Sequence, residues 1–243
     1  MNLNNKIDVT SVKNMYNEMP EIWPLDDKWY QYTYSQILKF LMRISSKYNF
    51  TDNMKILNAG SGGNTYNLPG IHYHVDIAEQ KIKDIPNAFV GSIEDLCFTD
   101  NKFDVCICVG SVINYCDALV ALSEMIRVLK SGGILILDFD QSHSFEFWGT
   151  SHFNKTADIV ETFNSGYADK TWVYSPQYIF NILKKYNVHL SEIQRYHILS
   201  PLIYRITHNE DRAATFAKYD KCVSSIPFLK NFSCNIILCS QKI

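Results

Sequence analysis

A glycine-rich turn and a nearby aspartate are the residues of this 243-residue chain that are best suited to bind a small molecule. Residues 55–59 form a strand-like run that leads into Gly60-Ser61-Gly62-Gly63, and a second, alternating run at 71–75 ends at Asp76. Glycines let a ligand approach the backbone, and a carboxylate at the end of a strand can accept hydrogen bonds from both hydroxyls of a ribose. The order of these residues therefore predicts a nucleoside site.

The spacing of the two features indicates which nucleoside. Asp76 lies only 16 positions after Gly60, and Pro69 and Gly70 fall between them, so little of the usual connecting helix can form. A dinucleotide site needs that helix because its N-terminal amides hold the pyrophosphate. S-adenosylmethionine has a ribose and an adenine but no phosphate. Thr65 also stands where the dinucleotide fingerprint has its third glycine. The sequence favours a methyl-donor site over a nicotinamide site.

Residues 54–141 resemble the class I S-adenosylmethionine-dependent methyltransferases. The first motif, Leu57-Asn58-Ala59-Gly60-Ser61-Gly62, and the short link Leu68-Pro69-Gly70 are most similar to the branch whose first motif reads Leu-Asn-x-Gly-x-Gly. Three further runs resemble the third strand, the start of the fourth strand, and the helix, turn and fifth strand; they are residues 90–98, 102–105 and 127–137. Four such runs in the order and spacing of the family are a specific signal.

The resemblance implies S-adenosyl-L-methionine as the cofactor and carries a set of contact residues with it. These are Asn58, Ala59, Gly60, Ser61, Gly62, Asp76, Ile77, Ser92, Ile93, Val109 and Gly110. Two positions depart from the family pattern. Asn58 replaces an acid that helps to organise the methionine end of the cofactor, and Ser92 replaces the acid at the adenine contact. An amide keeps part of the hydrogen bonding but brings no charge.

Composition predicts one compact domain that covers residues 1–243. With 47% apolar residues, the chain is long enough for a full core, and its net charge of −2 offers no basic surface for nucleic acid or an anionic membrane. Residues 1–20 contain no apolar core segment, and no run reaches the roughly 20 apolar residues of a membrane helix. Seven cysteines without zinc-type spacing predict a reduced, cytoplasmic protein with no metal site.

The chain alternates between predicted strands and helices, which indicates an α/β fold with a doubly wound, mostly parallel sheet of the Rossmann-like type. A helical cap at 1–50 precedes a cofactor-binding core at 51–141. We expect helices at 8–18, 27–47, 117–130 and 176–186, and strands near 54–59, 71–76, 87–92, 103–110 and 133–140. The resemblance implies that 188–199 and 233–240 form a closing antiparallel pair and complete seven strands. His72 and His74 are expected on the polar side of the second strand.

Two segments outside the core are expected to select the substrate. Residues 142–174 contain eight aromatic side chains without a helical period, and Gly149 and Gly166 lie near the ends as hinges of a lid. The alternative is that these aromatics only cover the sheet. Residues 200–231 are expected to be a helical insertion that either completes the lid or forms a homodimer contact. The predicted substrate-binding residues are Tyr30, Asn114, Tyr115 and Trp148.

Methyl transfer needs alignment of the acceptor, the methyl group and sulfur in a dry site, and a base only where the acceptor must lose a proton. Asp140 and His143, near the end of the predicted fifth strand, are the candidate bases, and His152 and His197 are weaker ones. The sequence predicts transfer to an oxygen or nitrogen of a small molecule. The alternatives are a cofactor-binding protein without catalysis and a nicotinamide-dependent oxidoreductase.

Overall fold

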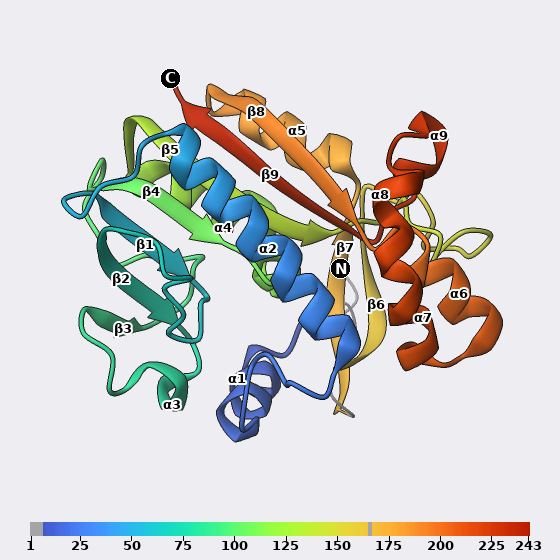
Figure 1. The fold of residues 1–243 in the computed structure, drawn as a ribbon. Helices are drawn as coiled ribbons and strands as arrows, with labels where there is room; N and C mark the ends of the chain where they lie inside the picture. Colours follow the sequence, from blue (N-terminus) through green and yellow to red (C-terminus); the bar gives the residue numbers. More distant parts are fainter. Residues whose placement is uncertain (1–6, 165–166) are drawn as a thin grey trace.

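The fold is built on one seven-stranded sheet with the strand order β3-β2-β1-β4-β5-β9-β8 (Figure 1). The computed structural model describes residues 7–164 and 167–243. The strands are β1 (Lys55–Ala59), β2 (Ile71–Asp76), β3 (Ala88–Val90), β4 (Phe103–Cys108), β5 (Leu129–Asp140), β8 (Val188–Tyr196) and β9 (Asn235–Lys242). Strands β1 to β5 pair in parallel, and β9 runs antiparallel to both β5 and β8. The predicted α/β fold and its closing antiparallel pair are confirmed.

Helices cover both faces of the sheet because successive strand residues point to opposite sides. Ile56, Val105 and Ile107 pack in a cluster with α2 (Lys28–Lys47). Their neighbours Leu57 and Cys106 pack in a second cluster with α4 (Ala118–Val128) and α5 (Pro176–Lys185). In Figure 1, α2 crosses the front of the sheet, and α4 and α5 lie behind it. Both faces are therefore buried, as a parallel sheet requires.

Side-chain caps fix where the main helices begin. The carboxylate of Asp27 accepts a hydrogen bond from the Tyr30 amide at 2.9 Å and starts α2, and Asp117 does the same for two amides at the start of α4. Such a cap satisfies a backbone donor that has no partner within the helix. A shorter helix, α1 (Val9–Glu18), precedes α2 and lies beyond the ends of β1 and β2 in Figure 1. The cap of α2 fixes where Tyr30 enters the fold.

No helix joins β1 to β2 among the described residues, which agrees with the spacing argument. Residues 60–70 form turns instead, and only the four-residue α3 (Glu79–Ile82) follows β2. A four-residue helix η1 (Val112–Tyr115), wound as a 3₁₀ helix, follows β4. The carboxyl ends of β1, β2 and β4 are thus surrounded by short, tight connections.

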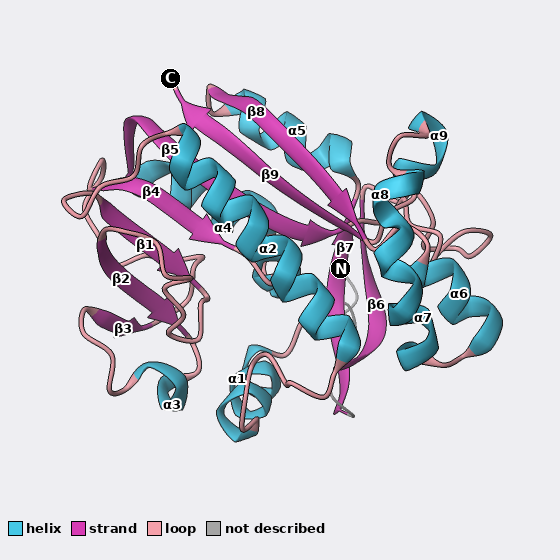
Figure 2. Ribbon diagram, viewed as in Figure 1, coloured by secondary structure: helices cyan, strands magenta, loops and turns pink. Residues whose placement is uncertain are grey.

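The expectation of an irregular lid at 142–174 is wrong in its second half, which forms a regular hairpin. Strands β6 (Ala157–Asn164) and β7 (Tyr167–Tyr174) pair antiparallel as a separate sheet (Figure 2). Phe147, Val160 and Val173 form a small core beneath it, which explains part of the aromatic content. Gly149 lies in an exposed turn, and Gly166 falls outside the described residues.

The insertion before β9 is helical, as expected. It comprises α6 (Ser200–Thr207), α7 (Glu210–Phe216), the 3₁₀ turn η2 (Ala217–Tyr219), α8 (Asp220–Val223) and α9 (Pro227–Lys230). The Asp220 carboxylate accepts hydrogen bonds from the amides of Ile198 and Leu199, which ties the insertion to the end of β8. Its first helices lie beside the hairpin in Figure 1.

Candidate active site

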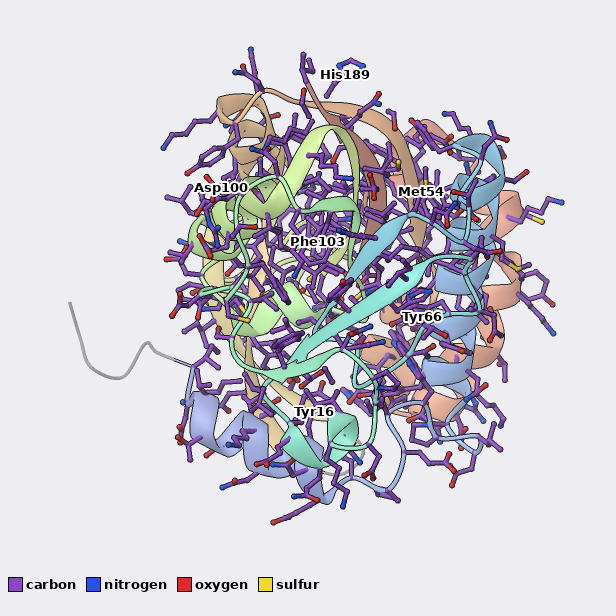
Figure 3. The ribbon with its side chains drawn as sticks, turned by 90° about the vertical axis from the view of Figure 1, so that its left-hand side faces the viewer. Tyr16, Met54, Tyr66, Asp100, Phe103 and His189 are labelled. Carbon is purple, nitrogen blue, oxygen red and sulfur yellow. The ribbon has the colours of Figure 1, made fainter. Side chains whose placement is uncertain are left out.

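A cavity of about 350 Å³ lies at the carboxyl ends of the parallel strands. One wall comes from the turns after β1, β2 and β4 and from the end of β5. The opposite wall comes from α1, the start of α2, the β6–β7 hairpin and the α6–α7 insertion. Figure 3 shows Tyr16 of α1 at the end of the molecule where β1 and β2 terminate, and Met54 and His189 toward the opposite end. Ligands of open α/β sheets bind at this edge.

The turn after β1 is held by backbone and carboxylate hydrogen bonds. The Gly60 amide donates to the Val75 carbonyl at 2.7 Å, and the amides of Gly62 and Ala78 donate to the two carboxylate oxygens of Asp76 at 2.7 and 2.8 Å. Burial raises the pKa of Asp76, and these amide donors oppose that shift. Each carboxylate oxygen keeps a free lone pair that can accept from a ribose hydroxyl.

Gly60 is required by the protein's own packing. Its φ of +74° lies in the left-handed region, and a Cβ atom there would lie 2.2 Å from Cγ1 of Val112 on η1. A side chain at this position would also enter the space where a ligand approaches the backbone. The contact with Val112 means that such a side chain would also push against η1.

Nine of the eleven predicted cofactor residues line the cavity: Gly60, Ser61, Gly62, Asp76, Ile77, Ser92, Ile93, Val109 and Gly110. Asn58 and Ala59 are outside the lining and fully buried. These two residues therefore do not face the cavity. Ala59 packs in the core cluster with α4, and the Asn58 side chain bonds His72 and the Tyr73 carbonyl of β2.

The Asn58 side chain bonds the imidazole of His72. Nε2 of His72 lies 2.9 Å from the Leu68 carbonyl, so this nitrogen carries the proton, and Nδ1 accepts from the Asn58 amide at 2.9 Å. A carboxylate in place of Asn58 would face the lone pair of that nitrogen. Asn58 is therefore engaged with β2 and not with the cavity. Asn58 Oδ1 is buried without a hydrogen-bond partner among the described residues.

His74 corrects the expectation of a polar-side position. It is only 1% exposed, and its Nδ1 lies 3.0 Å from the Ser61 hydroxyl beneath the glycine turn. Burial, with a smaller contribution from His72, lowers the pKa of His74 to about 4. This histidine is neutral at ordinary pH and supports the turn.

Asp138, which the sequence analysis did not single out, fixes the turn after β4 at Gly110 and Ser111. One of its oxygens accepts from the amides of Gly110 and Ser111 at 3.1 and 2.7 Å, and the other accepts from the Tyr196 hydroxyl of β8. Burial raises the pKa of Asp138 to about 6, and these donors oppose the shift. Asp138 lies two residues before Asp140, and such residues share one side of a strand, so the sequence could have indicated that Asp138 lies near the site.

Asp140, a predicted base, lines the cavity. One of its oxygens accepts from the Ser111 hydroxyl at 2.8 Å and from the Asn235 side chain. Burial, followed by the charge of Asp138 and then that of Glu146, raises the pKa of Asp140 to about 7. A carboxylate with this pKa can exchange a proton near neutrality.

The geometry does not support His143 as the base. It lies outside the cavity lining, and its ring packs on Phe153 and Phe232 with Nδ1 3.3 Å from Asn154. The two weaker candidates are also engaged elsewhere. His152 lies 2.9 Å from Asp158, and His197 is buried against Trp29, with its pKa lowered by burial to about 3.

Of the four predicted substrate residues, Tyr30 and Tyr115 line the cavity and Asn114 and Trp148 do not. Asn114 is fully buried and bonds the backbone of Asp140 and Trp172, so it ties β5 and β7 to η1. Trp148 is 54% exposed and packs beside Phe145 and Phe232. The lid segment reaches the cavity through polar residues instead, namely Glu146, Glu161, Thr162 and Thr171.

Aromatic side chains from several elements meet in the cavity and form its acceptor wall. The Tyr16 and Tyr115 rings are perpendicular with centroids 5.9 Å apart, and their hydroxyls lie 3.5 Å apart. Burial raises the pKa of Tyr16 to about 12. No periodic pattern predicts this group, because most of its members lie on different elements. They are Tyr16, Trp23, Trp29, Tyr30, Tyr66, Tyr115 and Tyr204.

The fold and the site define a methyltransferase of the S-adenosylmethionine-dependent kind, and the comparison with family models agrees. Residues 55–137 match the family model described as a methyltransferase domain. Over these residues the chain is similar to methyltransferase domains, which supports an S-adenosylmethionine-dependent methyltransferase with S-adenosylmethionine as its cofactor. Among curated proteins, none matches the chain by sequence.

Solved structures share the fold at low identity. The [4+2]-cyclase SpnF is 14% identical, with 98% of each chain covered and a TM-score of 0.59. An S-adenosylmethionine-dependent methyltransferase from Clostridium acetobutylicum is 12% identical over 96% of this chain and 98% of that one, at 0.56. The 1,6-didemethyltoxoflavin-N1-methyltransferase of Burkholderia thailandensis, solved with its namesake compound and S-adenosylhomocysteine, is 10% identical over 96% and 86%, at 0.55.

Within 7–164 and 167–243, no helix combines the length and hydrophobicity needed to cross a bilayer. The same residues contain no group of three or more histidine, cysteine, aspartate or glutamate side chains that could hold a metal ion.

Proposed function

We propose that this enzyme transfers the methyl group of S-adenosylmethionine to an oxygen or nitrogen of a small molecule. The observation that carries the proposal is the position of Asp140. Its carboxylate is bonded to Ser111 of a cofactor turn and lines the same cavity as the aromatic acceptor wall. A cavity of about 350 Å³ within one domain suits a small ligand.

The roles of individual residues follow from this arrangement. Asp76 would accept the ribose hydroxyls, Ser92 and Ile93 would face the adenine, and the amides around Gly60 would approach the methionine part. Tyr30 and Tyr115 would hold the acceptor. Asp140 would take the proton that an oxygen or nitrogen acceptor loses, because its raised pKa of about 7 suits proton transfer near neutral pH.

Calorimetry with S-adenosylhomocysteine, followed by transfer from labelled S-adenosylmethionine to panels of phenols, alcohols and amines, tests the proposal. We expect cofactor binding and a methylated oxygen or nitrogen product. Asp140→Asn should lower kcat by about a hundredfold or more without weakening S-adenosylhomocysteine binding beyond twofold. Asp52→Asn, on the exposed surface, is the matched control. Cofactor binding without turnover on any panel would favour the non-catalytic alternative.

A further inference from the structure

The cavity as a whole is lined by many more acidic than basic side chains. Six carboxylates line the cavity as a whole: Asp76, Glu94, Asp140, Glu146, Glu161 and Glu210. Lys81 is the one cationic side chain in the described lining, and its ammonium already donates to the Met19 carbonyl. An anionic acceptor would therefore meet repulsion from several carboxylates and attraction from a single, engaged lysine.

Glu146 gives the clearest sign that this charge awaits a ligand. Burial raises the pKa of Glu146, and the Cys234 thiol at 3.6 Å is the one hydrogen-bond donor recorded for its carboxylate within the described chain. A thiol is a weak donor, so it compensates little of the desolvation of a carboxylate. A second polar group on the same wall, the Thr162 hydroxyl, is buried without a partner among the described residues.

The surroundings of these carboxylates suit an organic cation rather than a metal ion. No set of three ligating side chains suitable for a metal occurs in the part of the chain that the structure describes. Trp23, Trp29 and Tyr30 line the cavity, and aromatic faces attract ammonium groups. Carboxylates combined with aromatic rings are a recognition chemistry for substituted amines.

We infer that the methyl acceptor is an amine that enters as a cation, with Glu146 holding its charge and Asp140 receiving its proton. This inference rests on the proposed function and narrows it to nitrogen. The protonated amine gives a proton to the Asp140 carboxylate, and the freed lone pair forms the N–CH₃ bond. The C–S bond breaks, and its electron pair stays on sulfur as S-adenosylhomocysteine. The methylated nitrogen carries the positive charge that the sulfonium loses.

A pair of probes with the same shape and different charge tests the inference. Choline and its uncharged counterpart 3,3-dimethylbutan-1-ol are titrated into the full-length protein saturated with S-adenosylhomocysteine, and binding is followed by the fluorescence of the cavity tryptophans. We expect choline to bind at least fivefold tighter, an effect on the order of one charge-assisted contact. Equal affinity for the two probes would overturn the inference.

Variants then show whether Glu146 is responsible for the preference for choline over the uncharged probe. Glu146→Gln should reduce the preference to about one, while Glu146→Asp, which keeps the charge, should retain most of it. Glu79→Gln, exposed on α3 and outside the cavity lining, should leave the preference unchanged. If Glu146 instead served the sulfonium, Glu146→Gln would weaken S-adenosylmethionine much more than S-adenosylhomocysteine, and that result would also overturn the inference.

Two other results distinguish failure of the amine acceptor from failure of the proposed methyl transfer. Methylation of phenols or alcohols but of no amine would refute the amine acceptor and leave oxygen transfer standing. Failure to bind S-adenosylhomocysteine would refute the proposed function itself.

Discussion

The two halves of the cavity are built from different parts of the polypeptide. The cofactor half consists of turns directly after parallel strands, and the backbone amides of Gly62, Gly110 and Ser111 are fixed by Asp76 and Asp138. The acceptor half consists of side chains from helices and a hairpin that are far apart in sequence. The cofactor half depends on backbone shape, so few residues decide it. The acceptor half depends on side-chain chemistry, so specificity can change there without altering the fold.

The largest effect should come from Gly60→Val, which attacks backbone shape. Left-handed strain and the collision with Val112 each cost about 1–3 kcal/mol, so the affinity for S-adenosylhomocysteine should fall by about a hundredfold or more. Gly132→Val is a matched control, because its φ is +78° and nothing lies within 4 Å of its added Cβ. Equal cofactor affinity in both variants, measured by calorimetry, would show that the turn tolerates a side chain.

A smaller effect is expected for Asp76→Ala. The change removes the two predicted hydrogen bonds to the ribose, each worth about 1.5–3 kcal/mol, and releases the amides of Gly62 and Ala78. Affinity for S-adenosylhomocysteine should fall at least tenfold by calorimetry. The acceptor half should be indifferent to this change, so unaltered binding of the choline probe to any cofactor-loaded fraction serves as the control. A loss below twofold would contradict the ribose assignment.

Asp140→Asn should change how stability depends on pH. Because the folded pKa of about 7 lies above the ordinary 3.8, the neutral carboxyl favours the fold below pH about 4, and this contribution is lost as the pH rises through 7. The variant leaves unchanged the side chains that face position 140, which are those of Ser111, Asn235, Asp138 and Glu146. Relative to wild type, the variant should gain on the order of 10 °C in melting temperature between pH 4 and pH 8. Parallel pH profiles for both proteins would contradict the raised pKa.

The smallest effect is expected for Trp148→Ala, and it separates the acceptor wall from the outer surface. Trp148 is half exposed and lies outside the cavity lining, so its loss should cost about 1 kcal/mol of unfolding free energy and about 2–4 °C in melting temperature. Cofactor affinity and the acceptor KM should stay within twofold. A raised KM at an unchanged melting temperature would restore the lid role that the sequence suggested.

The contrast between the halves also explains what the sequence could predict. Gly60, Asp76, Ser92 and Gly110 follow strands at family spacing, so contiguous motifs locate them. Glu146, Tyr16 and Glu210 reach the cavity only after three distant segments pack together, and single-residue patterns carry no signal for that. The sequence argument placed His143 and Trp148 in the site because it assigned the whole segment after β5 to the ligand. It could not anticipate that a small core of Phe147, Val160 and Val173 would fix the hairpin and turn its polar residues inward.

The bond from Tyr196 to Asp138 has a consequence for synthesis on the ribosome. Asp138 holds the amides of Gly110 and Ser111, yet its second oxygen depends on a hydroxyl from the edge strand β8, 58 residues further along the chain. A nascent chain that has emerged only as far as β7 already contains the glycine turn but lacks this partner, and it also lacks β9, which separates β8 from β5. The cofactor pocket therefore becomes complete late in translation, once the C-terminal pair has joined the sheet.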